Sequence, residues 1–162
     1  MSQVRRRQFL IAAGALLAAP LAQAQKSDSP ARVAILDGAH EGSSPEMWKA
    51  FHRRLNELGY IEGKSIIFER RWGKAETSRL PALAAELVAL KPAVIVTVQT
   101  SPALAAKLAT STIPIVAIQI ADPIRVGLAT SLSRPDGNIT GFPTFSLELT
   151  GKWLELLHEI SP

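Results

Sequence analysis

The chain has 162 residues and no cysteine, so disulfide bonds are excluded. It carries 18 Lys and Arg against 14 Asp and Glu, but three of the arginines lie in residues 1–24, where no acidic residue offsets them. The other 138 residues have 15 basic and 14 acidic side chains, a balance that gives no support for nucleic-acid binding. That length is enough for one domain with its own hydrophobic core.

The first 24 residues have the organisation of a secretory signal peptide. Arg5, Arg6 and Arg7 form a cationic start, and residues 9–21 (FLIAAGALLAAPL) form an apolar run. This run is shorter than the roughly 20 residues needed to cross a membrane. Residues 22–24 (AQA) match the small-x-small pattern that signal peptidase reads. We therefore expect a periplasmic protein, with cleavage after Ala24 and a linker over residues 25–30. The paired arginines fit either the twin-arginine or the general secretion route.

After the linker, apolar segments alternate with segments of helical periodicity. The first segment, RVAIL at residues 32–36, predicts a strand buried on both faces. Ser44 and Pro45 then provide a hydroxyl cap and a proline at the first helical position, and Gly59 ends that helix. A strand at residues 65–72 has a more polar end, which indicates a place near the sheet edge. We expect further strands at residues 93–98, 114–120 and 139–144, and further helices at residues 80–90, 102–109, 126–132 and 149–160.

This alternation of strands and helices predicts an α/β fold. Because a helix connects each strand to the next, the sheet should be mostly parallel and doubly wound, with helices on both faces. The crossover connections should be right-handed. A Rossmann-like or flavodoxin-like lobe has this architecture. In such sheets, ligands bind beyond the carboxyl ends of the strands, next to the point where the strand order reverses.

Polar residues, together with Gly38 and Pro123, follow three of the expected strands, and all of them should lie at that edge of the sheet. They are the candidate ligand-binding residues, namely Asp37, Gly38, Gln99, Thr100, Ser101, Asp122 and Pro123.

Each position also has a purely structural interpretation. Ser101 can cap the third helix, with a proline at its first position, and the free N–H groups of a helix N-terminus also attract a carboxylate. Asp122 can accept a ligand ammonium or hydroxyl group, pair with Arg125, or bond the backbone near it in an Asx turn. Asp37 can cap or turn the chain, and Gly38 allows a close backbone approach.

Enzyme motifs are missing from the sequence. It contains no G-x-G-x-x-G, G-x-x-x-x-G-K-[ST] or G-x-S-x-G pattern. His40, His52 and His158 lie far apart and lack metal-ligand spacing. We interpret His52 and His158 as solvated helix residues, and the three tryptophans as packing residues. We therefore expect a binding protein rather than an enzyme, with no catalytic residue, metal or cofactor.

The chain from about residue 32 to residue 162 is similar to one protein family. The similarity rests on three sequence motifs in this order: ELGYIEG, then IPIVAI followed by ADP, then RPDGNITG. The chain resembles the ABC-transporter substrate-binding proteins that include tryptophan- and tyrosine-type binding lipoproteins. The resemblance implies a type I periplasmic binding fold, in which two lobes hold a ligand in the cleft between them. It also implies that a small amino-acid-like solute is delivered to a membrane permease and its ATPase. The family's cleft positions match the candidate residues given above.

Members of that family are about twice as long as this chain. The resemblance therefore implies an N-terminal lobe at residues 31–141, a hinge at residues 142–146, and the first helix of a truncated second lobe at residues 147–162. We thus expect a fragment, in which an apolar stripe on the last helix has no sheet to cover and favours self-association. That stripe consists of Leu149, Trp153, Leu156, Leu157 and Ile160.

Two other functions are compatible with the residues alone. One is a secreted α/β enzyme whose catalytic residues lie in missing sequence. The other is an effector-sensing domain like those of sugar-responsive repressors, which share the fold. The export signal argues against the repressor-like domain, because repressors stay with their DNA.

Overall fold

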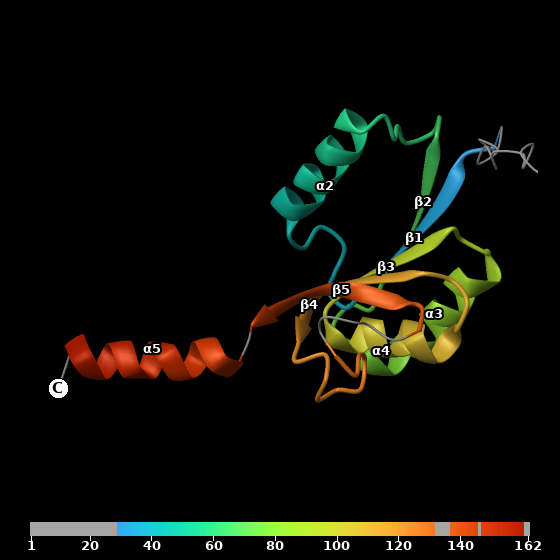
Figure 1. The fold of residues 1–162 in the computed structure, drawn as a ribbon. Coiled ribbons are helices and arrows are strands. Elements are labelled where there is room, and N and C mark those ends of the chain that lie inside the picture. The colour runs from blue at the N-terminus through green and yellow to red at the C-terminus, as the bar shows by residue number, and fades with distance from the viewer. Residues whose placement is uncertain (1–28, 132–136, 146, 161–162) are drawn as a thin grey trace, which may run out of the picture.

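A computed structural model describes residues 29–131, 137–145 and 147–160, and its sheet has five parallel strands in the order β2-β1-β3-β4-β5 (Figure 1). The expected α/β fold with a parallel, doubly wound sheet is confirmed. The edge position expected for the second strand is confirmed as well. The strands are β1 (Ala31–Asp37), β2 (Ile66–Trp72), β3 (Val94–Val98), β4 (Ile115–Ala121) and β5 (Ile139–Phe145).

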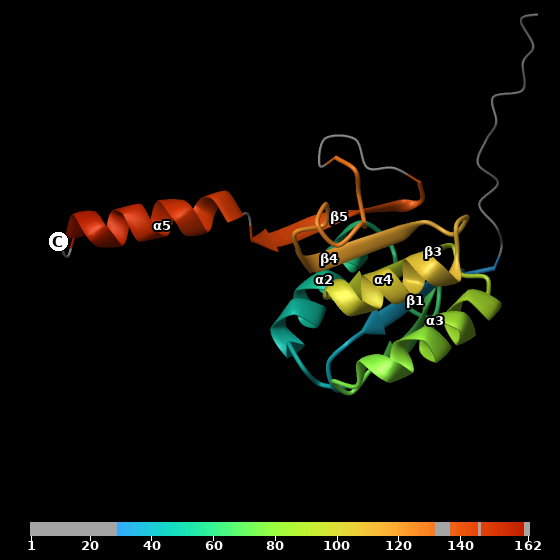
Figure 2. The same cartoon turned by 90° about the horizontal axis from the view of Figure 1, so that it is seen from below.

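Helices cover both faces of the sheet. Figures 1 and 2 show α2 on one face, and α3 and α4 side by side on the other. The first connection therefore crosses one face and the next two cross the opposite face, so the direction of winding reverses between β1 and β3. The helical segments are α2 (Pro45–Glu57), the 3-10 turn η1 (Thr77–Arg79), α3 (Leu80–Ala89), α4 (Thr100–Ala109) and α5 (Leu147–Ile160).

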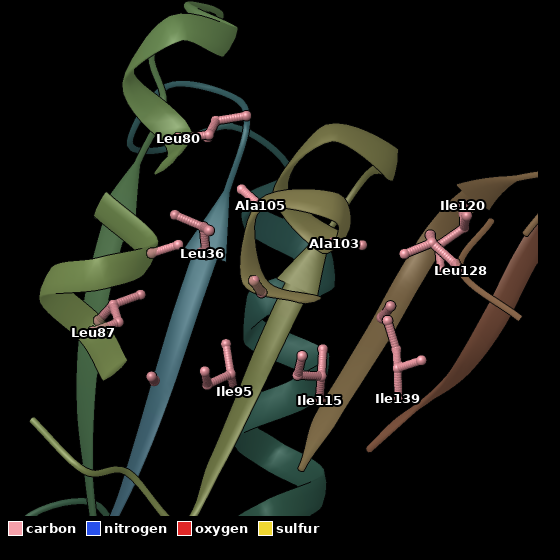
Figure 3. Close-up of a cluster of buried hydrophobic side chains, with 14 residues drawn as sticks. Leu36, Leu80, Leu87, Ile95, Ala103, Ala105, Ile115, Ile120, Leu128 and Ile139 are labelled. Atoms are coloured by element: carbon pink, nitrogen blue, oxygen red, sulfur yellow. The ribbon is translucent and has the colours of Figure 1, made fainter. Parts of the chain in front are cut away.

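The main hydrophobic core lies between the sheet and the pair α3 and α4 (Figure 3). Leu36, Ile95 and Ile115 project from three neighbouring strands and are fully buried. Ala103 and Ala106 of α4 are also fully buried. Because their side chains are small, the backbone of α4 can lie close to the sheet. This close packing fixes the N-terminus of α4 at the carboxyl edge of the sheet.

The opposite face has a smaller core beneath α2. Trp48, Phe51 and Leu55 pack against a cluster that includes Ile35 and Phe68, and no residue of α2 is fully buried. Pro45 begins this helix as expected, and Gly59 follows its end at φ 85°. The expected hydroxyl cap is wrong, because Ser44 makes no side-chain capping bond.

His52 differs from the sequence-based interpretation. Its ring is half-buried and stands edge-on to Phe68, with 4.9 Å between ring centroids. Its Nε2 lies 3.3 Å from a guanidinium nitrogen of Arg70. The interpretation as a solvated residue is therefore wrong for His52, whereas His158 is exposed as expected.

The connection between β4 and β5 also differs from expectation. A helix was expected at residues 126–132, but no helix forms at residues 126–131. Hydrogen-bonded turns cover residues 123–127, residues 128–131 have no regular secondary structure, and Leu132 lies outside the described residues. The N–H of Leu128 bonds to the carbonyl of Pro123 at 2.8 Å, and Gly127 has φ 72°. This left-handed glycine ends any helical run, while Leu128 anchors the turn in the core.

Helix α5 follows β5 after residue 146 and extends away from the sheet (Figure 1). Three residues of the expected apolar stripe, Leu156, Leu157 and Ile160, are 48%, 61% and 79% exposed. The side chains of Leu149 and Trp153 lie outside the described part, as do residues 1–28 with the expected signal peptide and most of the linker. Among the helices described, none is both long and apolar enough to span a bilayer.

Candidate functional site

A hollow of about 340 Å³ opens at the carboxyl edge of the sheet, where β2, β1 and β3 end. Its volume is within the range of small-molecule sites. It lies at the reversal of winding between β1 and β3, which is where doubly wound sheets bind ligands. The lining residues are Gly38, Ala39, His40, Ala75, Thr77, Leu80, Gln99, Ser101 and Pro102.

The segments after β1 and β2 form one wall of this hollow and are joined through their backbones. The N–H groups of Gly73, Lys74 and Ala75 donate to the carbonyls of Asp37, Ala39 and Gly38 at 2.7, 3.0 and 2.8 Å, respectively. A Cβ on Gly73 would lie only 3.2 Å from the carbonyl oxygen of Gly38. The absence of a side chain at Gly73 therefore allows the two segments to come together.

Asp37 lies behind this wall rather than in the hollow. It is 2% exposed, and its Oδ1 accepts a 2.9 Å hydrogen bond from the N–H of Ala39. The buried Trp48 indole N–H faces this carboxyl without forming a full hydrogen bond. Burial raises the pKa of the Asp37 carboxyl, and these two N–H groups only partly offset the rise. The structure thus gives Asp37 the turn-forming role that was one of its two interpretations.

The turn from β3 into α4 forms the other wall. The helix begins at Thr100, and Gln99 precedes it at φ 78° and ψ 166° without a side-chain cap. The expected capping role of Ser101 is therefore wrong: Ser101 lies within the first turn, and its exposed side chain lines the hollow. The Thr100 hydroxyl oxygen accepts a 3.1 Å hydrogen bond from the N–H of Ala121, which links α4 to the end of β4.

Asp122 and Pro123 lie outside this hollow. Oδ1 of Asp122 accepts a 3.0 Å hydrogen bond from the N–H of Arg125, so the Asx-turn interpretation is confirmed. Pro123 instead borders a smaller hollow of about 60 Å³, together with Leu128 and Ile139. The candidate residues thus form two groups, one around the hollow and one at the turn after β4. The hydrogen bond from the N–H of Ala121 to the hydroxyl oxygen of Thr100 connects the two groups.

Six lining residues were not among the candidates predicted from the sequence, namely Ala39, His40, Ala75, Thr77, Leu80 and Pro102. His40 lies two positions beyond the candidate Gly38, and Ala75 and Thr77 follow β2. The end of the second strand was a detectable signal, because every carboxyl end of a parallel sheet meets the same edge. The strand order that places β2 beside β1 could not be read from the sequence.

Left-handed backbone conformations gather at this edge. Of seven non-glycine residues with positive φ in the described ranges, all but Lys91 lie beyond or near the carboxyl end of a strand. Such conformations cost energy and occur preferentially at ligand-binding sites. The six are Ser44, Lys74, Ala75, Gln99, Gln119 and Asp122. The described residues contain no group of three metal-ligating side chains.

Residues 32–162 match the family described as "ABC transporter substrate binding protein". The chain belongs to this family. Its members are solute-binding proteins rather than enzymes, and they act outside the cytoplasm. Membership therefore favours binding over the secreted-enzyme and repressor-like alternatives.

A "Tyrosine-binding protein" of Clostridioides difficile is 32% identical to this chain over 114 residues, which are 70% of this chain and 32% of that protein. Among solved structures, a conserved domain protein from Vibrio cholerae is 29% identical, with a TM-score of 0.73 over 83% of this chain and 45% of that one. An "ABC domain in complex with L-Trp" from Streptococcus pneumonia is 26% identical, with a TM-score of 0.65 over 71% of this chain and 39% of that one. This chain thus spans less than half of each of these three relatives.

Proposed function

We propose that the chain is the N-terminal lobe of an extracytoplasmic solute-binding protein, and that it binds a small amino-acid-like solute at the carboxyl edge of its sheet. The hollow at the reversal between β1 and β3 carries this proposal, because its position and volume suit a small ligand. Two relatives support the choice of solute, since one is named a tyrosine-binding protein and another was solved with L-Trp.

The first turn of α4 supplies the chemistry for a solute carboxylate. The backbone N–H groups of Thr100 and Ser101 precede the point where bonding within the helix begins, and the Ser101 hydroxyl lines the hollow. A helix N-terminus also carries a partial positive charge that favours an anion. Gly38 and Gln99 border the same space.

Asp122 and Pro123 complete the proposed set of contacts from the neighbouring strand. The second carboxylate oxygen of Asp122 forms no hydrogen bond with another described residue and suits the ammonium group of an amino acid. Asp37 contributes by holding the turn at Ala39 that borders the hollow.

The proposed division of the chain rests on its resemblance to the family and on the greater lengths of its relatives. Residues 31–141 form the lobe, residues 142–146 the hinge, and residues 147–162 begin a second lobe that closes over the solute. The exposed apolar residues Leu156, Leu157 and Ile160 on α5 support this division, because they suit a helix that packs against a further sheet. The periplasmic location, the signal peptide at residues 1–24, and delivery to a permease and its ATPase are parts of the same proposal.

A thermal-shift screen of the chain against the standard amino acids tests this function. A ligand present well above its Kd stabilises the folded state by mass action, so a bound amino acid should raise Tm. Ser101→Ala should weaken that rise, whereas Ser111→Ala, an exposed serine in the loop after α4, should preserve it. A panel in which no amino acid raises Tm would contradict the proposal.

A further inference from the structure

Gln99 has an unusual backbone conformation for a residue with a side chain. Its φ of 78° and ψ of 166° lie in a region that is essentially confined to glycine. Bonds on both sides fix this conformation, since its N–H donates to the carbonyl of Ile118 at 2.9 Å and its carbonyl accepts from Ala103 at 3.4 Å. The fold therefore maintains a strained residue at the mouth of the hollow.

The strained conformation directs the Gln99 carboxamide across Gly38. A Cβ on Gly38 would collide with Oε1 of Gln99 and would lie 3.3 Å from Cγ of Pro102. Gly38 does not have positive φ, so a substitution here would act through contact with the Gln99 and Pro102 side chains rather than through the backbone conformation. The carboxamide thus covers the end of β1 at the point where the winding reverses.

The polar atoms of this carboxamide remain free for a ligand. Gln99 is exposed and lines the hollow, and its side chain forms no hydrogen bond with another described residue. A solute held by its carboxylate at the first turn of α4 extends past Gln99 toward the segments after β1 and β2. The side chain of that solute therefore meets one donor group and one acceptor atom at the mouth of the hollow.

We propose that Gln99 is the specificity-determining residue of this site, and that it selects solutes whose side chain carries a hydrogen-bonding group over apolar ones. The inference deepens the proposed function and rests on it. An apolar side chain would cover the carboxamide without bonding it, and an unpaired polar group shielded from water is costly. A site built to hydrogen-bond a substrate hydroxyl strongly rejects an analogue that lacks the hydroxyl. An apolar pocket discriminates far less between substrates that differ only slightly in size.

L-Tyrosine and L-phenylalanine are the matched probes, because they differ only in one hydroxyl group. We expect the wild-type chain to bind L-tyrosine with a Kd at least about tenfold lower than its Kd for L-phenylalanine. Both constants are measured from the dependence of Tm on probe concentration. Gln99→Leu should abolish this preference. Gln119→Leu is the control, because Gln119 is also exposed and has positive φ but does not line the hollow. Equal affinities in the wild type, or a preference that survives Gln99→Leu, would overturn the proposal.

A second measurement tests the geometry without any solute. Gln99→Gly should raise Tm by about 2–8 °C by relieving the backbone strain. Gly38→Ala should lower Tm in the wild type and should cost clearly less in the Gln99→Gly background, so the pair should be coupled in a double-mutant cycle. Additive effects would refute the contact between the two residues. If neither probe binds the wild type, the specificity role fails, whereas the proposed amino-acid function is decided separately by the screen of the standard amino acids; the cycle still decides the geometry.

Discussion

The hydroxyl oxygen of Thr100 accepts a hydrogen bond from the backbone N–H of Ala121 at 3.1 Å. This bond joins the first turn of α4 to the last residue of β4, and therefore connects the hollow with the turn that contains Asp122. It is a direct side-chain link between the two groups of candidate residues.

Thr100→Val removes the acceptor while nearly preserving the side-chain volume. We expect the free energy of unfolding to fall by about 0.5–1.5 kcal/mol, because the Ala121 N–H loses its protein partner. Urea denaturation measures this change. Thr100→Ser keeps the oxygen and should remain within about 0.5 kcal/mol of the wild type. An unchanged free energy of unfolding in Thr100→Val would show that the hydrogen bond contributes nothing to stability.

Gly141 allows β4 and β5 to pair closely. A Cβ at this position would collide with the carbonyl oxygen of Ala117, so Gly141→Ala must push the two strands apart. We expect a loss of about 3 kcal/mol or more in the free energy of unfolding. Gly42→Ala is the control, because Gly42 has φ 82° but open space around it, and it should cost only about 1–2 kcal/mol. Comparable losses would contradict the close pairing.

The main core can be tested at two leucines on neighbouring helices. Leu87 of α3 is fully buried, whereas Leu108 of α4 is 88% exposed. Leu87→Ala should lower the free energy of unfolding by about 2–5 kcal/mol by creating a cavity. Leu108→Ala should change it by no more than about 0.5 kcal/mol. Chemical denaturation of both variants checks the packing of α3 and α4 on the sheet.

Asp37 should make stability depend on pH. Burial raises its pKa above the ordinary value of 3.8, so the folded state favours the protonated carboxyl. The stabilisation that protonation provides is present below about pH 3.8 and is lost as the pH rises through the folded-state pKa. Asp37→Asn keeps an oxygen for the Ala39 N–H but cannot ionise. Its stability relative to the wild type should therefore increase as the pH is raised from 3.5 to 7 in parallel urea titrations, and a decrease would contradict the assignment.

The elements of the fold could largely be predicted from the sequence, because apolar runs and helical periodicity determine strands and helices locally. The start of α4 could not. Ser101 and Pro102 match a cap and a first helical position, but the turn at Gln99 starts the helix at Thr100, and nothing in the sequence marks a glutamine for positive φ. The burial of His52 was missed for a different reason, since it depends on Phe68 and Arg70 of a strand whose place beside α2 is set by the tertiary fold.

The most direct test of the proposed site is a nuclear magnetic resonance titration of ¹⁵N-labelled chain with L-tyrosine. We expect saturable shifts of the backbone amides that border the hollow, above all those of Gly38, His40, Thr77 and Ser101. Amides at the opposite edge of the sheet, such as Ser111 and Thr112, should remain unchanged. Saturable shifts centred away from the hollow would contradict the site at the carboxyl edge, and the absence of any shift would contradict L-tyrosine as its solute.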